Sequence, residues 1–319
     1  MTEIDRFRFD FNVGDIFDVG ADLLWRDQAG DNVLWFMANN VPDFGSGSVA
    51  VLPTVTPDWH VKAAAAFAGL DSDILWQNDN GALALWKMTG STVTAIHALP
   101  NPGPTWHVVG DNDFDDDFDD DILFQNDNGS LVIWTGINPV SGTVSGMFAG
   151  TQNPGPTWHV AATGDLGILW QNDSGGLALW EFPTFAAGSF TFLGVTALPT
   201  VDASWHVKGV QKIGFTADTT DIVFQNDNGA VVVWQMGGSL GTTILAQNLI
   251  NLNPGPAWHI VGLRDMDGDT LLDLVFQNDN GAAAVWEDYQ SLGGGMGTFN
   301  TVLAITPNPN PNGLVWDLL

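Results

Sequence analysis

Short apolar stretches recur along this chain, and polar turn residues follow them. The segment DILWQNDNGALALW, from Asp73, shows the pattern: DILWQ alternates apolar faces, NDNG follows, and ALALW alternates again. Asparagine and glycine tolerate the backbone angles of tight turns, so the segment predicts a β-hairpin. No window shows a sustained period of 3.6 residues, and we therefore expect few helices.

The hairpin segment recurs six times with small changes. Its copies begin at Asp22, Asp73, Asp121, Gly167, Asp221 and Asp273. The glutamine of each copy, an arginine in the first, stands at position 26, 77, 125, 171, 225 or 277, which gives a period of 46 to 54 residues. A Trp-His pair precedes five copies, and the variant Trp316-Asp317 follows the last. With one later extended segment, each unit is predicted to hold four strands.

Four strands in a unit of about 50 residues are typical of a β-propeller blade. We predict an all-β fold, with residues 1–319 forming a single six-bladed β-propeller of four-stranded antiparallel blades. The blades are expected at approximately residues 1–58 plus 316–319, 59–105, 106–157, 158–204, 205–257 and 258–315. The first unit lacks a preceding Trp-His strand, so the N- and C-terminal segments should pair and close the ring. A seventh, strongly diverged blade is the alternative.

Composition narrows the classes of protein that fit. The 319 residues are 45% hydrophobic, which allows a full core and excludes disorder as the main description. They include 37 acidic and 8 basic residues, for a net charge of -29, so we expect no nucleic-acid partner. The chain contains no apolar run long enough to span a membrane, so we expect no membrane insertion. Without cysteine, the chain has no disulfide or thiolate chemistry.

Two units carry aspartates at alternate positions just before the hairpin. These candidate metal ligands are Asp113, Asp115, Asp117 and Asp121 in one unit, and Asp265, Asp267, Asp269 and Asp273 in another. Calcium takes six to eight oxygen ligands, which such side chains and the seventh-position carbonyls of Asp119 and Leu271 could supply. We therefore predict calcium as the cofactor. In the earlier loop, a ligand pattern that starts at Asp111 also fits the sequence. For both loops, the alternative is a solvated acidic loop without metal.

The Asp-rich loop, the DILWQNDNG hairpin and the period together resemble the FG-GAP or VCBS-type propeller repeat, known from integrin alpha-subunit heads and many secreted bacterial proteins. The resemblance covers essentially the whole chain. In that family the loop reads Asp-x-Asn/Asp-x-Asp-Gly-x-x-Asp and binds calcium, which implies that role for the eight aspartates. Phe118 and Thr270 replace the family's sixth-position glycine, which implies weaker binding than the family pattern.

Other repeated residues have structural interpretations. All 15 tryptophans fall into three slots of the repeat, and five of the six histidines share the Trp-His slot, where we expect each to bond backbone of a neighbour. The turn amides and tryptophans could also bind a sugar, although turn formation and burial account for the same residues. Arg264, Tyr289 and His97 depart from the repeat but form no recognisable catalytic set. We therefore assign no catalytic residues.

These observations predict a non-enzymatic calcium-binding module that acts outside the cell or at its surface. Its expected partner is a glycan, in a lectin-like role, or a cell-surface protein, in adhesion. A purely structural or protein-interaction propeller and a calcium-dependent polysaccharide-active enzyme are the alternatives. The start, MTEIDRFRFDF, shows no readable signal peptide, so export is expected to use another route. The ligand-binding residues and the oligomeric state stay open.

Overall fold

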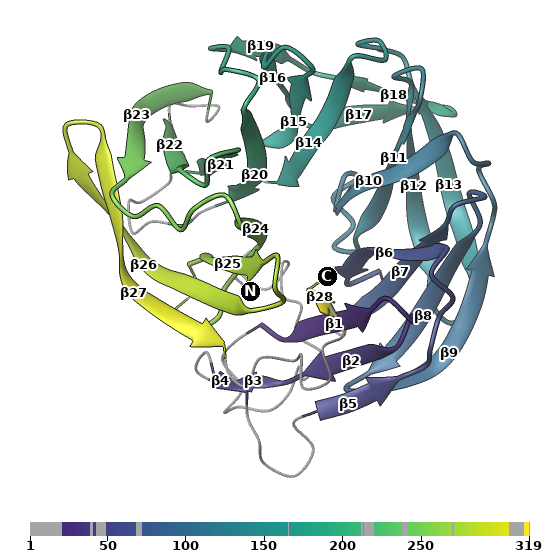
Figure 1. Cartoon of the computed structure of the whole chain (residues 1–319). Coiled ribbons are helices and arrows are strands. Elements are labelled where there is room, and N and C mark those ends of the chain that lie inside the picture. Colours follow the sequence, from purple (N-terminus) through teal and green to yellow (C-terminus); the bar gives the residue numbers. More distant parts are fainter. Residues whose placement is uncertain are drawn as a thin grey trace. The chain divides into compact units, whose positions relative to one another are not determined.

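The computed structural model describes residues 21–38, 41–42, 49–67, 72–164, 166–211, 213, 220–237, 242–269, 271–305 and 316–318 (Figure 1). These residues form β-strands joined by turns and bends, so the predicted all-β class is confirmed. Within these ranges no helix is long and apolar enough to cross a membrane. The described residues belong to two compact units, one from Val55–Thr200 and the other from Gly14–Thr54 together with Val201–Leu319.

Each repeat folds into antiparallel strands of the kind found in propeller blades. The second repeat orders its strands β6 (Trp59–Ala65), β7 (Asp73–Asn78), β8 (Leu83–Thr89) and β9 (Thr92–Leu99). The third and fourth repeats use the same order in β10 (Trp106–Asn112), β11 (Asp121–Asn126), β12 (Leu131–Asn138), β13 (Thr143–Gly150), and in β14 (Trp158–Gly164), β15 (Gly167–Asn172), β16 (Leu177–Trp180), β19 (Val195–Leu198). The fifth and sixth use it in β20 (Trp205–Gln211), β21 (Asp221–Asn226), β22 (Val231–Gly237), β23 (Thr243–Ile250), and in β24 (Trp258–Arg264), β25 (Asp273–Asn278), β26 (Ala283–Gly293), β27 (Met296–Ile305).

The first repeat takes its first strand from the other end of the chain. β28 (Trp316–Leu318) pairs antiparallel with β1 (Leu23–Asp27), and the sheet continues through β2 (Asn32–Trp35) to β5 (Val49–Leu52). The short strands β3 (Met37–Ala38) and β4 (Val41–Pro42) form a separate pair. The predicted pairing of the N- and C-terminal segments is therefore present.

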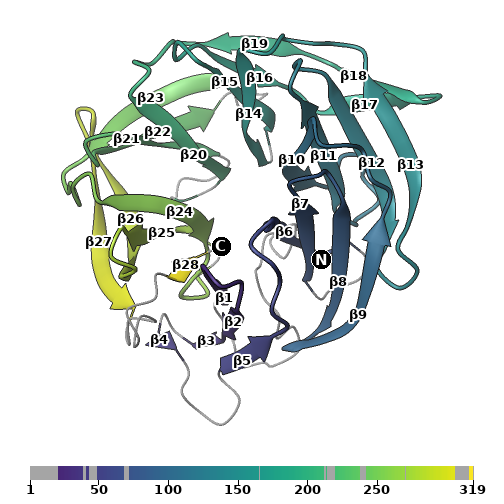
Figure 2. The same cartoon turned by 45° about the vertical axis from the view of Figure 1, so that its right-hand side comes forward.

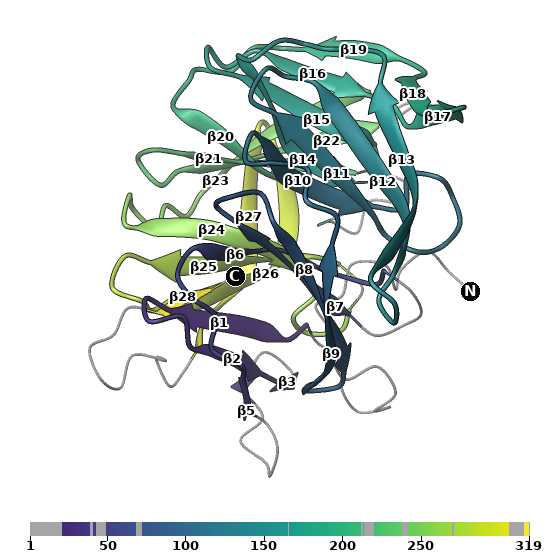
Figure 3. The same cartoon turned by 90° about the vertical axis from the view of Figure 1, so that its right-hand side faces the viewer.

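Two hairpins depart from the predicted set of separate four-stranded sheets. In the fourth repeat, β17 (Pro183–Ala186) and β18 (Ser189–Phe192) form an added hairpin, and β18 pairs in parallel with β13 (Figure 2 and Figure 3). In the sixth repeat, the long β26–β27 hairpin reaches β23 in the same way. These contacts extend the third sheet to six strands and join the fifth and sixth into one eight-stranded sheet.

The core of each unit lies between the sheets of consecutive repeats. Every residue of β7 is buried, so this strand is covered on both faces and does not have the half-exposed alternation expected of DILWQ. Leu75 and Leu85 of the second repeat pack in one cluster with Phe124 and Trp134 of the third. Burying one such side chain contributes about 1.5 to 3 kcal/mol, so sheet-on-sheet packing is the main stabilising term.

The glutamine of the repeat joins consecutive sheets within a unit. Gln77 donates from Nε2 to the Trp106 carbonyl at 2.7 Å and accepts the Val108 N–H at 2.9 Å. Gln125 and Gln225 make the same pair of bonds to the repeats that follow them. In the sixth repeat, Gln277 accepts the Leu318 N–H at 3.0 Å, which ties that repeat to the strand completing the first.

Candidate functional site

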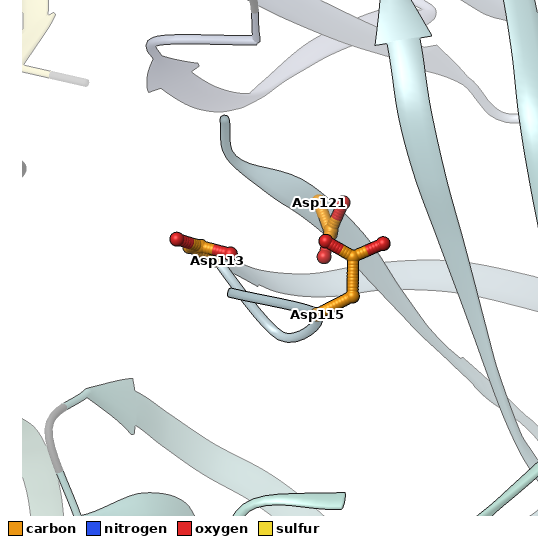
Figure 4. A group of neighbouring side chains, drawn as sticks. All are labelled: Asp113, Asp115 and Asp121. Atoms are coloured by element: carbon orange, nitrogen blue, oxygen red, sulfur yellow. The ribbon is translucent and has the colours of Figure 1, made fainter. Parts of the chain in front are cut away.

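The acidic loop of the third repeat connects β10 to β11. Asp111 lies inside β10, opposite Ile122, so the loop begins after it and the frame that starts at Asp113 fits. One carboxylate oxygen each of Asp113, Asp115 and Asp121 lies within 4.8 Å of the other two (Figure 4). Ligands on one calcium ion stand about 5 Å apart at most when each is near 2.5 Å from the metal, so the spacing suits such an ion.

Hydrogen bonds from the backbone shape this loop. The Asp113 carboxylate accepts the N–H groups of Asp117 and Phe118 at 3.0 and 2.9 Å. Asp121 accepts the Phe114 N–H at 2.9 Å. Asp117 itself bonds the Asp119 N–H and lies outside the group of three, although it was predicted to be a ligand. Asp116 and Phe118 have positive φ angles of 64° and 77°, which are strained for residues with a side chain.

The loop of the sixth repeat uses the same plan with different residues. Asp265, Asp267 and Asp269 have carboxylate oxygens within 4.8 Å of one another. Asp265 accepts the Gly268 N–H at 2.7 Å, and this glycine has a φ of 80°. The fourth predicted ligand, Asp273, accepts the Met266 N–H at 2.8 Å and lies outside the group of three. Thr270, the sixth position, lies outside the described residues.

Burial disfavours the charged form of carboxylates in both loops and so raises their pKa values. It raises the pKa of Asp121 to about 8, with a further rise from the Asp115 charge. It raises the pKa of Asp273 to about 9, with further rises from Asp267 and Glu287. Burial also raises the pKa of Asp115 and of Asp269. A bound divalent cation would reverse these effects because it favours the charged carboxylates.

An orphaned oxygen supports a cation at the third-repeat loop. Asp121 is fully buried, and its Oδ1 has no hydrogen-bond partner within the described part of the chain. Its other oxygen holds the Phe114 N–H. A buried carboxylate oxygen without a partner is costly, and a metal ligand is one way to satisfy it. The oxygen-only donor set of both loops fits a hard cation such as calcium.

Glu287, which the sequence did not suggest, interacts with the sixth-repeat loop but lies outside its group of three aspartates. This residue follows Trp286 in β26, is 4% exposed, and interacts electrostatically with Asp267 and Asp269. Burial, followed by these charges, raises its pKa to about 7. The repeat alignment gives no distinct signal for Glu287, because the corresponding positions of the second to fifth repeats carry varied polar residues, including another glutamate. These residues are Lys87, Thr135, Glu181 and Gln235.

Arg264 and Tyr289, two of the residues that break the repeat, are buried. Arg264 lies opposite Asp273 in the β24–β25 register, but its guanidinium packs beside Gly262, and the pKa of Asp273 is nevertheless raised. The Tyr289 hydroxyl accepts a bond from the Asn248 amide at 2.9 Å, and burial raises its pKa to about 12. Their burial gives both residues a structural interpretation.

The five repeat histidines bond side chains, whereas we expected backbone partners. In each case Nε2 lies 2.7 to 2.8 Å from an aspartate Oδ1 of the same repeat's NDNG or NDSG turn. The pairs are His60–Asp79, His107–Asp127, His159–Asp173, His206–Asp227 and His259–Asp279. About half of each histidine side chain is exposed, so each pair joins the first strand of its repeat to the hairpin turn at the surface.

Two aromatic pockets occur at the same position of two repeats. The pocket of the third repeat has a volume of about 270 Å³ and is lined by Trp106, Phe124, Trp134, Met147, Phe148 and Gly188, among others. The pocket of the fifth repeat has the same volume and is lined by Trp205, Phe224, Trp234, Gln247, Leu249 and Gly295, among others. In both, the glycine comes from the hairpin of the next repeat that pairs with the fourth strand.

No model of a protein family matches the chain, and no curated protein matches it either.

Proposed function

We propose that this chain is a six-bladed β-propeller that binds calcium in two blades and glycans in its aromatic pockets, outside the cell and without catalysing a reaction. The observation that carries the glycan assignment is the recurrence of one pocket in the third and fifth repeats. A repeated pocket offers several equivalent sites, and multivalent binding raises the avidity for a polymer with repeated sugars.

The chemistry of the pockets suits a sugar ring. Each joins a half-buried Trp of the Trp-His slot to the aromatic pair of the two middle strands. Those pairs, Phe124–Trp134 and Phe224–Trp234, have centroid distances of 4.6 and 4.8 Å. These pairs form the buried floor, and the half-buried Trp106 or Trp205 can pack its face against the apolar C–H face of a sugar. Asp202 and Gln247 in the fifth-repeat pocket can bond the sugar hydroxyls. The volume lies just below the range of about 300 to 1,000 Å³ that is usual for drug-sized ligands, which favours one sugar unit.

Calcium binding is supported by the oxygen-only groups of both loops and by the orphaned Asp121 oxygen. Extracellular modules bind calcium in about the 10⁻⁴ to 10⁻³ M range, and strained loops of this kind suit weak sites. The acidic composition and the resemblance to secreted propellers support an extracellular location.

The ring is supported by bonds within each unit. The glutamine bonds connect the second, third and fourth repeats in one unit, and the fifth, sixth and first in the other.

A glycan array followed by calorimetry tests the binding function. Met147 and Leu249 line the two pockets and are 47% and 43% exposed, so the double variant Met147→Glu/Leu249→Glu should fold and lose binding. The matched control is Ile96→Glu/Val302→Glu. Ile96 and Val302 occupy the Met147 position in other repeats, are 55% and 51% exposed, and line neither pocket.

Binding to a defined glycan that the pocket variant loses and the control keeps would support the proposal. Equal loss in both double variants, or no binding to any glycan with calcium present, would reject it. Comparison of the calcium-loaded and metal-free proteins shows whether the loops are needed for the pockets or only for stability.

A further inference from the structure

Asp273 and Glu287 face each other across two strands. Leu274 pairs with Trp286 in the β25–β26 ladder, so the next residues along, Asp273 and Glu287, are opposite one another. Residues directly opposite share one face of the sheet. Both are at least 96% buried, with exposed fractions of 3% and 4%. Two buried carboxylates in this arrangement repel each other unless a proton or a cation lies between them.

Glu287 also has a buried carboxylate oxygen, Oε1, without a hydrogen-bond partner among the described residues. Its strongest charge interactions are with Asp267, Asp288 and Asp269, and it also acts on Asp273. The carboxylate therefore adds negative charge near the group of Asp265, Asp267 and Asp269, although it lies outside the 4.8 Å spacing of that group.

The second repeat shows how the same position is satisfied without metal. Lys87 corresponds to Glu287, and its Nζ lies 3.4 Å from Oδ1 of the fully buried Asp73. The lysine thus supplies a positive charge beside the carboxylate that corresponds to Asp273. In the third repeat, Thr135 occupies this position and bonds Asp115 without adding charge. The residue after the third-strand tryptophan therefore sets the charge of each site.

We propose that Glu287 is an additional metal ligand of the sixth-repeat site, supplied by β26 from outside the acidic loop. This inference rests on the proposed calcium binding of that loop. It gives the sixth-repeat site four acidic ligands, against the three grouped aspartates of the third-repeat site. Because ligand charge is one of the factors that set calcium affinity, the sixth-repeat site binds calcium more tightly than the third-repeat site.

Calcium titration by calorimetry tests this inference in an Asp115→Ala background, which removes the third-repeat site. Glu287→Gln keeps the size of the side chain and removes its charge, and should weaken calcium binding by roughly 10- to 100-fold. Glu181→Gln is the matched control, since Glu181 has the same repeat position but Gly167 stands where the other repeats have the buried aspartate. It should leave the affinity unchanged.

A second variant reads out stability as well as affinity. Glu287→Lys copies Lys87, so it should abolish calcium binding at this site and raise the melting temperature of the metal-free protein. If the Asp115→Ala parent binds calcium but Glu287→Gln behaves like Glu181→Gln, the inference is wrong and the calcium loop stands. If the parent binds no calcium, the calcium assignment of this loop fails, and the role of Glu287 fails with it.

Discussion

The acidic loops of the third and sixth repeats share one spacing of aspartates but differ in backbone strain and in the charge of the residue beside the loop. At the fourth position, where both loops need a positive φ, the third has Asp116 and the sixth has Gly268. The third loop adds a second positive φ at Phe118. Beside the loop, the third repeat has neutral Thr135 and the sixth has Glu287. Strain in the third repeat is therefore mainly in the backbone, and in the sixth it is mainly in charge.

This difference shows that a ligand pattern alone does not set the properties of a site. Backbone strain persists whether or not a cation is bound, but repulsion between carboxylates is relieved by one. We therefore expect the sixth repeat to depend more on calcium and the third to gain more from relief of its backbone. Three measurements test this contrast.

The largest expected effect is the pH dependence of the free energy of unfolding of the metal-free protein. The pKa of Asp121 is raised to about 8 and that of Asp273 to about 9 by burial, against 3.8 for the ordinary group. The folded state therefore keeps protons that the unfolded state loses, and the free energy of unfolding should fall as pH rises from about 4 to about 8 or 9. Urea unfolding at several pH values measures this slope.

Saturating calcium should flatten the same pH dependence, because bound carboxylates are ionised in the folded state as well. Asp273→Asn should remove more of the slope than Asp121→Asn if the sixth loop carries the larger charge strain. Equal slopes in the presence and absence of calcium would contradict the contrast between the loops.

The next effect is the calcium-dependent stabilisation itself. Asp267→Ala should lose the contribution of the sixth-repeat site, which is about 2.7 kcal/mol when calcium is at 100 times its dissociation constant. Asp115→Ala should lose less of the calcium-dependent stabilisation, because the third-repeat site has one acidic ligand fewer in our proposal. Calorimetric melting with and without calcium measures both, and Asp79→Ala, an exposed turn variant, is the control. A larger loss from Asp115→Ala would reverse the proposed ranking.

The smallest effect concerns the backbone of the third loop. Phe118 is 75% exposed and has a φ of 77°, so Phe118→Gly loses little packing and relieves strain. We expect a gain of about 1 kcal/mol in the free energy of unfolding. The reciprocal change Gly268→Asp should cost the sixth loop a similar amount. Phe118→Ala keeps the strained angle and should show no gain, which separates backbone relief from loss of the ring.

The sequence predicted features that repeat with the period and missed features that depend on a neighbour. The hairpins, the first-strand Trp-His segments and the pairing of Trp316–Leu318 with Leu23–Asp27 follow from local turn chemistry and the repeat. The proposed role of Glu287 follows from its position opposite Asp273 in the β25–β26 register. The spacing of aspartates along one loop does not reveal this position. The Gly188 and Gly295 walls of the pockets come from contacts with the preceding repeat.

The pairing of β28 with β1 sets an order of events during synthesis. A ribosome makes β1 before the other described strands and β28 after them, so the first sheet stays one strand short until the strands between them have been made. Until then, the ladder edge of β1 is open to other strands, including those of nascent copies of the same chain. We expect the middle repeats to acquire their structure before this sheet, so that its shortest strand, β28, is the last to pair.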